Sequence, residues 1–196
     1  MPPGLSLKLK NMACDLTLTG RGVGCKDALG GIKRIYVAEW EADVWNWDDP
    51  TAGTTAGVTI TDTGVTEVVF YTYDMTRGSG SLTQTITSDL VAGTVFFDQV
   101  CSVTFNKAAA ADIVEITNLV KGRVAVMVED NNGNWFVMGL KNGVEVSGGT
   151  AQTGQAAGDQ NGFTLEFSAQ EVSAAPFLAL TTGAPTDTDI TITAAP

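Results

Sequence analysis

Apolar and polar residues alternate along most of the chain, as they do in strands that bury one face. β-Branched residues, threonine in particular, occupy many of the polar positions, which also favours strands. We therefore expect a mainly β protein. The predicted strands cover residues 5–10, 15–19, 32–40, 58–61, 65–73, 81–87, 94–105, 123–129, 135–140 and 162–168, with a further short strand at 189–193.

The segment 106–122 departs from this alternation. Asn106 is a favourable N-cap, an alanine run follows it, and Gly122 comes just after Lys121. These features predict one flanking helix over about residues 107–121. Its apolar side chains recur at intervals of three and four, so we expect them to face a sheet: Ile113, Ile116, Leu119 and Val120.

The five residues Asp130–Asn134 lie between two apolar runs and predict a hairpin. The Asn132-Gly133 pair suits the positive φ angles of a type I′ turn. A calcium loop is the alternative for such an Asp/Asn-rich segment. We reject it because the glycine is fourth rather than sixth in the segment and no glutamate follows at the required distance.

Two stretches, 46–57 and 147–161, hold too few apolar residues for a core, and we expect long surface loops there. Residues 179–196 are rich in Thr, Ala and Pro and predict a C-terminal extension with at most one added strand. The expected organisation is an N-terminal arm with the first strands (1–34), a β-sandwich or barrel core with the helix (35–178), and this extension.

The distribution of charge along the chain restricts the possible functions more than the chain length does. The 196 residues include 11 Lys and Arg, 22 Asp and Glu and no histidine, a net charge of −11. Residues 1–34 carry six basic and two acidic side chains, so residues 35–196 carry a net charge of −15. Such an acidic body argues against a nucleic-acid-binding surface. The basic arm either reaches an acidic neighbouring subunit or consists of solvated strand edges.

The lack of histidine excludes Ser-His-Asp and Cys-His nucleophile pairs as well as His-ligated metal sites. Cys14, Cys25 and Cys101 match no metal-binding spacing, and we expect reduced, buried thiols. No run approaches the ~20 apolar residues of a membrane-spanning helix. The N-terminus alternates apolar and polar residues, unlike a signal peptide, so we expect a protein made and kept in a cytosol.

Two glycine-rich stretches, 20–24 and 154–162, lack the lysine and the following helix of phosphate-binding loops, and we interpret them as turns.

Carboxylate pairs are the remaining enzymatic candidates, because glycosidases use two acids and need no histidine. The candidate pairs are Glu39 with Glu41, Asp48 with Asp49, Glu129 with Asp130, and Asp187 with Asp189.

Three tryptophans, Trp40, Trp45 and Trp47, lie near the first two of these pairs and could stack on a sugar ring. The alternative is that they cover the rim of the core or lie in a subunit contact. Nothing distinguishes one acid pair from the others. The sequence therefore predicts no enzyme, and no catalytic, cofactor-binding or metal-binding residue.

At the helix and the following hairpin the sequence resembles a known family. The segments 93–100, 118–122, 123–130 and 158–167, together with the turn before Trp135, look like a major tail-tube structural protein of tailed bacteriophages. The similarity covers roughly residues 30–178. It implies a tail-tube-like β fold with one flanking helix, without catalytic residues or cofactors.

The resemblance also implies an assembly. Tail-tube proteins form stacked, usually hexameric, rings around a channel for genome DNA, and long loops and terminal arms bridge the rings. The expected partners are copies of this chain, other phage tail proteins and DNA in passage, and the expected location is the virion tail after synthesis in the host cytoplasm. Gly78, Gly80 and the stretch 147–161 become candidates for inter-ring contacts.

Physical arguments agree with this interpretation. An acidic wall repels phosphates, so DNA can slide past it. The apolar strands 65–73 and 94–101 would have exposed edges that neighbouring subunits cover. Segments 46–57 and 179–196 depart from the simplest tube proteins, which leaves another virion ring, adaptor or capsid-decorating protein open. A carbohydrate-binding or glycoside-hydrolysing β domain is the further alternative.

Overall fold

The structure is a computed structural model that describes residues 27–40, 45–48, 59–62, 68–107, 109–178 and 190–193. The predicted strands 5–10 and 15–19, together with Cys14 and Cys25, lie outside these residues. Within them the protein is mainly β with one helix, as predicted. No helix in these ranges is long and apolar enough to cross a membrane.

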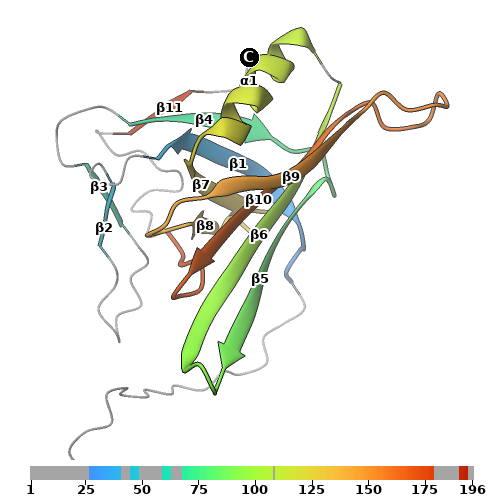
Figure 1. The fold of residues 1–196 in the computed structure, drawn as a ribbon. Coiled ribbons are helices and arrows are strands. Elements are labelled where there is room, and N and C mark those ends of the chain that lie inside the picture. Colours follow the sequence, from blue (N-terminus) through green and yellow to red (C-terminus); the bar gives the residue numbers. More distant parts are fainter. Residues whose placement is uncertain are drawn as a thin grey trace, which may run out of the picture.

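The strands form two main sheets and a separate hairpin (Figure 1). The five-stranded sheet has the order β11 (Ile190–Thr193), β4 (Val68–Asp74), β1 (Ile32–Glu39), β7 (Val124–Asp130) and β8 (Trp135–Met138). The four-stranded sheet has the order β5 (Gly80–Asp89), β6 (Thr94–Asn106), β10 (Gly162–Glu171) and β9 (Glu145–Gln152). The hairpin pairs β2 (Trp45–Asp48) with β3 (Thr59–Asp62). All neighbouring strands are antiparallel except β11 and β4.

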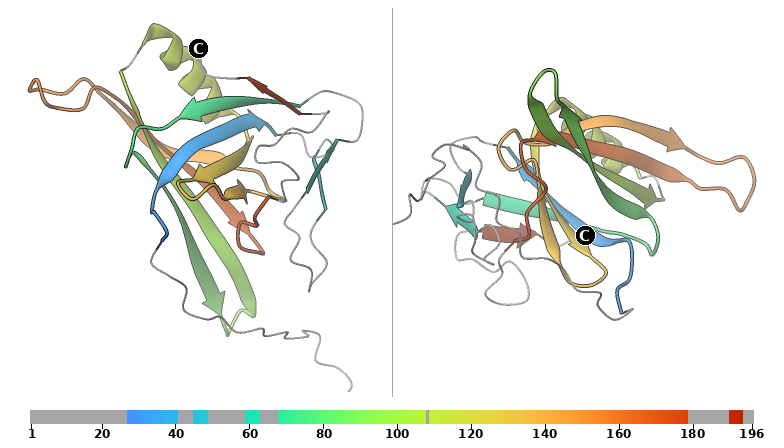
Figure 2. Two further views of the ribbon diagram at one scale, coloured as in Figure 1. Left: turned by 180° about the vertical axis from the view of Figure 1, so that it is seen from behind. Right: turned by 90° about the horizontal axis from the view of Figure 1, so that it is seen from below.

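The two sheets pack face to face over a common core (Figure 2). On β10 the buried side chains are Phe163, Leu165, Phe167 and Ala169, at every second position. They meet residues of β1 and β7 from the other sheet, such as Ile35 and Val126. Burying one such side chain stabilises the fold by about 1.5–3 kcal/mol. The sequence alternation thus translates directly into a sandwich-like arrangement.

Strand β7 is buried on both faces, which explains its uninterrupted apolar run. Val124, Val126 and Val128 face the core between the sheets. Ala125 and Met127 face a second apolar cluster on the other side of the five-stranded sheet, with Tyr36, Phe70, Trp135, Val137, Leu140 and Leu178. A strand at the centre of its sheet is covered on both sides, so alternation is lost there.

The predicted helix exists, but it begins later and packs more loosely than expected. Helix α1 covers Ala110–Lys121, and its N-cap is Ala109, whose N–H donates to the Asp112 carboxylate at 2.7 Å. Asn106 is instead the last residue of β6, and Lys107 turns the chain with a positive φ of 63°. Ile116 and Leu119 pack against the core, whereas Ile113 and Val120 are more than half exposed. The prediction that all four apolar side chains face a sheet was therefore wrong for two of them.

Two predicted loops contain strands. Residues 147–152 of the stretch 147–161 belong to β9, which pairs along its length with β10. Its small and polar residues lie at a sheet edge where no apolar burial is needed, so the alternation rule missed it. Residues 46–48, predicted as loop, belong to β2. Residues 49–57 of that predicted loop lie outside the described ranges. The additional strand near the C-terminus is confirmed as β11.

Candidate functional site

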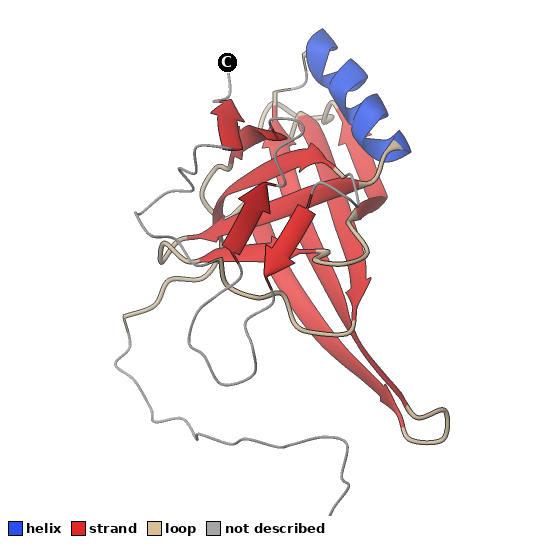
Figure 3. Cartoon of the chain, turned by 90° about the vertical axis from the view of Figure 1, so that its left-hand side faces the viewer, coloured by secondary structure: helices blue, strands red, loops and turns tan. Residues whose placement is uncertain are grey.

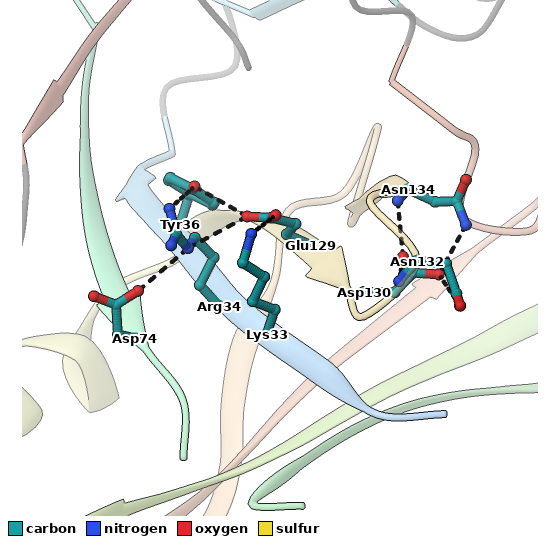
Figure 4. A network of polar contacts seen from close by, with 8 residues as sticks. All are labelled: Lys33, Arg34, Tyr36, Asp74, Glu129, Asp130, Asn132 and Asn134. Carbon is teal, nitrogen blue, oxygen red and sulfur yellow. Dashed lines mark hydrogen bonds and ion pairs between the residues drawn. The ribbon is translucent and has the colours of Figure 1, made fainter. Parts of the chain in front are cut away.

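The candidate acid pair Glu129 and Asp130 does not form a site, because the two side chains take part in separate interactions (Figure 4). The buried Glu129 carboxylate lies 2.6 Å from Lys33 Nζ and 3.3 Å from Arg34 Nε. The Tyr36 hydroxyl donates to it at 3.4 Å. A β-bulge at Lys33 allows both basic side chains to reach Glu129. This carboxylate neutralises two cations and joins β1 to β7.

The same network shifts the pKa values of Arg34 and Tyr36. The hydrogen bond from Arg34 to the Tyr36 hydroxyl raises the pKa of the guanidinium above its ordinary value. Burial raises the pKa of the Tyr36 phenol. Both groups therefore stay protonated at neutral pH, and neither can act as a base there.

Asp130 is occupied within the hairpin turn. Its carboxylate accepts bonds from the backbone N–H groups of Asn132 and Asn134 at 2.8 and 2.7 Å, and from both side-chain amides at 3.1 and 2.9 Å. Burial opposes ionisation, but these four bonds outweigh it and hold the pKa of Asp130 below its usual value. Amide groups thus occupy the carboxylate oxygens that a cation would need.

The hairpin is confirmed, but its turn type was predicted wrongly. Gly133 has a φ of +80°, whereas Asn131 and Asn132 have negative φ, so the turn is not type I′. Gly133 N–H donates to Asp130 O at 3.3 Å, and Asp130 N–H donates to Asn134 O at 2.9 Å. This is a type I turn followed by a left-handed glycine. The Asp130 carboxylate favours it by bonding the following backbone N–H groups.

The other candidate pairs are not assembled in the described residues. Glu39 is exposed at the end of β1, and Asp48 ends β2. Their partners Glu41 and Asp49, and both members of the pair Asp187 and Asp189, lie outside these ranges. Trp40 packs against the second apolar cluster, while Trp45 and Trp47 lie on β2. No group of three or more Cys, Asp or Glu side chains in the described ranges could hold a metal ion.

Cys101 fits the prediction of a buried, reduced thiol. It is fully buried in the core between the sheets and forms no disulfide. Burial raises its pKa to about 12. It is therefore not a nucleophile at neutral pH.

The outer face of the four-stranded sheet is the most unusual surface of the molecule. Its four strands carry no lysine or arginine, and four of their five acidic residues lie on this face, while the fifth, Glu171, is buried. Opposite the core-facing positions, the outer face carries mainly Thr, Ser and acidic side chains. They are Ser81, Thr83, Thr85, Thr87 and Asp89 on β5, Asp98, Ser102 and Thr104 on β6, Thr164, Glu166 and Ser168 on β10, and Glu145 and Thr150 on β9. We call this surface the acidic face.

The outer edges of β5 and β9 have no strand partner in the described ranges, although α1 contacts part of β9, and they are not the edges that the sequence suggested. Strands β4 and β6 were expected to have exposed edges, but β4 lies between β11 and β1, and β6 lies between β5 and β10. In the five-stranded sheet, β8 is covered by the segment 175–178, which exchanges backbone bonds with it. Within the described ranges, no backbone hydrogen bond is made along the outer edges of β5 and β9.

The two predicted contact glycines differ in their surroundings. Gly80 packs inside the molecule, since a Cβ there would lie 3.3 Å from Ile32. Gly78 has a φ of +80° in an exposed turn and open space around it. The remainder of the predicted loop 147–161 is a turn ordered by Asp159, whose carboxylate accepts from the N–H groups of Gln155 and Ala156 at 2.8 and 2.7 Å.

The sequence interpretation missed one exposed feature, the tip of the hairpin between β5 and β6. Leu90 and Val91 are 96% and 100% exposed there. Apolar residues in a tight turn, between Asp89 and Gly93, were the available signal.

No protein-family model, curated protein or solved structure matches this chain.

Proposed function

We propose that this protein is a structural subunit that assembles through its four-stranded sheet into rings around a channel, as a tail-tube subunit of a tailed bacteriophage. The observation that carries the proposal is the four-stranded sheet, which combines an acidic face with two edge strands that have no strand partner among the described residues. Its outer face would line the channel. The five-stranded sheet and the helix would lie on the outside.

The strand order supports closure into a ring. Because β5, β6, β10 and β9 alternate in direction, β9 of one copy runs antiparallel to β5 of the next copy when both copies point the same way. One edge strand can therefore pair with the other without a change in the hydrogen-bonding pattern. Such a contact uses two different surfaces, and it closes into a ring when the rotation between copies allows.

The chemistry of the acidic face supports a channel for a polyanion. Asp89, Asp98 and Glu166 repel phosphates, whereas Glu145 pairs with Arg123, and the four strands themselves carry no lysine or arginine that would hold a phosphate. Threonine and serine hydroxyls keep the surface hydrated. DNA would pass such a wall without being retained.

The experiment is electron microscopy of the purified full-length chain at increasing concentration. We expect rings or tubes with a central hole. A protein that stays monomeric at millimolar concentration and in molecular-crowding buffer would overturn the proposal.

A cross-linking experiment tests the edges themselves. Cysteines are placed on the two edge strands in separate chains, Thr85→Cys on β5 and Thr150→Cys on β9, in a background with Cys14→Ser and Cys25→Ser. Both positions are exposed. A short bis-maleimide should join the two variants when they are mixed and should join neither variant to itself. Equal cross-linking of each variant to itself would contradict the head-to-tail arrangement.

A further inference from the structure

The tip of the β5–β6 hairpin is an ordered apolar projection. Strand pairing continues to its end, where Asp89 faces Thr94. The Asp89 carboxylate accepts bonds from Val91 N–H at 2.8 Å and Ala92 N–H at 3.1 Å, which fix the turn. Leu90 and Val91 nevertheless contact almost nothing, and Ile86 and Val95 behind them are more than half exposed. A fixed turn with bare apolar side chains is typical of a contact site.

A cavity of about 490 Å³ lies between α1 and the five-stranded sheet. Val37, Ala38 and Trp40 of the β1 segment, Tyr71 of β4 and Leu119 of α1 supply much of its wall. Helix α1 has no fully buried residue, so the cavity lies under a loosely packed cover. A cavity of about 150 Å³ accommodates benzene. The seven side-chain carbons of Leu90 and Val91 therefore fit with room to spare.

The projection and the cavity lie at opposite ends of the molecule. Figure 1 shows α1 at one end and the β5–β6 turn at the other, and Figure 3 shows the same separation from the side. The tip of a chain therefore does not reach its own cavity. A second copy, displaced along the long direction of β5 and β6, can bring its tip to the cavity of the first.

We propose that the Leu90–Val91 tip of one copy inserts into the cavity under α1 of a second copy, and that this contact stacks one ring on the next. The proposal rests on the proposed function. Contacts of this kind use two different surfaces and do not close on themselves, so they propagate as a filament. Here the filament would be the tube.

The small size of the contact favours an occupant that binds at several sites at once, such as a second copy within a ring. Two side chains bury far less than the ~1,200 Å² that stable complexes need, so a single free partner would dissociate quickly. A ring presents several copies of the tip at once, and the affinities then combine. The contact thus becomes stable only between multimeric partners.

Charge suggests how the tip is oriented. Backbone bonds from Ala92 and Val91 keep Asp89 ionised beside the tip. Three charged residues line the cavity: Arg123, Glu39 and Glu115. The Tyr73 hydroxyl donates to Glu115, and Arg123, the one cation of these three, makes an exposed ion pair with Glu145 at 3.2 Å. We expect Asp89 to lie beside Arg123 and away from Glu39.

The test combines tip and cavity variants in the full-length chain. Leu90→Asp with Val91→Asp should leave rings intact but abolish stacking, because charged groups cannot enter an apolar cavity. Asn118→Trp should fill the cavity from α1 and shorten tubes in the same way. Thr117→Trp is the matched control, because residue 117 is exposed on the same helix but does not line the cavity. It should leave tube length unchanged.

A cross-linking experiment distinguishes a failure of the stacking contact from a failure of the ring itself. In the Cys14→Ser, Cys25→Ser background, Val91→Cys mixed with Asn118→Cys should give an interchain bond in a yield on the order of tenfold above Val91→Cys mixed with Thr117→Cys. Rings without this cross-link, or tip variants with tubes of normal length, overturn the inference and leave the ring proposal standing. Cross-linked linear oligomers without rings would support the contact between tip and cavity, trapped by the cross-link between single copies, but would overturn both the ring and its stacking.

Discussion

The ammonium group of Lys33 lies 2.6 Å from the carboxylate of Glu129, although 96 positions separate the two residues. Arg34 and Tyr36 approach the same carboxylate, at 3.3 and 3.4 Å. Glu129 is buried, whereas Lys33 and Arg34 remain partly in water, with side-chain exposures of 51% and 34%. This carboxylate is therefore the central group of the network.

Glu129→Gln removes the charge and keeps the shape of the side chain. We expect a loss of about 1–3 kcal/mol in the free energy of unfolding, because two cations lose their partner but can still rehydrate. Urea denaturation at neutral pH measures it. Glu145→Gln is the control, since its ion pair with Arg123 at 3.2 Å is exposed and should cost less than about 1 kcal/mol. Equal effects of the two substitutions would contradict the central role of Glu129.

Asp130 should make stability depend on acid pH. Its pKa in the folded protein lies below the ordinary value of 3.8, so the folded state favours the ionised form. The resulting stabilisation is complete above the unfolded-state pKa and is lost as pH falls through the lower folded-state pKa. The difference in unfolding free energy between wild type and Asp130→Asn should therefore be constant near neutrality and shrink below about pH 4. A difference that grows on acidification would show that the sign is wrong.

The sequence predicted those strands that bury one face. On β10 the alternation is regular, because Phe163, Leu165, Phe167 and Ala169 enter the core between the sheets. The pattern failed for β9, where Gly148, Gly149 and Thr150 gave no apolar signal. A Cβ at Gly149 would lie 2.7 Å from the Thr164 carbonyl oxygen, so the close approach of β9 to β10 requires glycine. A residue that suggested a loop was in fact needed for strand pairing.

The candidate site was harder to predict, because it depends on pairing between distant segments. Neighbours in sequence, such as Glu129 and Asp130, belong to different interactions, whereas Glu129 and Lys33 belong to one. The open edges of β5 and β9 follow from strand order, which alternation does not encode. The lack of basic residues on the four-stranded sheet was present in the sequence. It became visible as a surface only once those four strands were known to be neighbours.

Gln99 and Glu171 connect the sheets through their buried polar groups. Gln99 Oε1 accepts from Gly139 N–H at 3.1 Å, and its Nε2 donates to Ser173 O at 3.2 Å. Glu171 accepts from the N–H groups of Lys141 and Asn142 at 2.9 and 2.7 Å. Both side chains are almost fully buried, and both hold the turn between β8 and β9.

Gln99→Met should therefore cost about 1–3 kcal/mol, because it leaves the buried N–H of Gly139 without a partner and removes the bond to the carbonyl of the exposed Ser173. Hydrogen exchange should accelerate first at Gly139 and its neighbours. Gln170→Met is the control, since Gln170 is exposed and its side-chain amide donates to Asp98 at 2.8 Å, while its backbone bond from Asn142 does not depend on the side chain. We expect a change within about 0.5 kcal/mol there. Unchanged exchange at Gly139 in Gln99→Met would exclude the role assigned to Gln99.

The acidic face gives the most direct prediction about function. Glu166 is exposed at the centre of the four-stranded sheet and bonds the Ser147 hydroxyl at 3.1 Å. In a ring, Glu166→Lys places one cation per copy on the channel wall and repeats it in every stacked ring. Phosphates would then be held rather than repelled, because each neutralised phosphate releases a counterion. Assembled Glu166→Lys should retain double-stranded DNA at low salt and release it as salt rises.

Asp27→Lys makes the same change in net charge at an exposed position outside the four-stranded sheet. If the acidic face lines the channel, this control assembly should retain far less DNA than Glu166→Lys when both are measured by absorbance at low and high salt. Nuclease protection adds a second criterion, because DNA held inside a tube should resist digestion and DNA on an outer surface should not. Equal retention by the two variants, or retained DNA that is fully digested, would mean that the acidic face lies on the outside of the assembly.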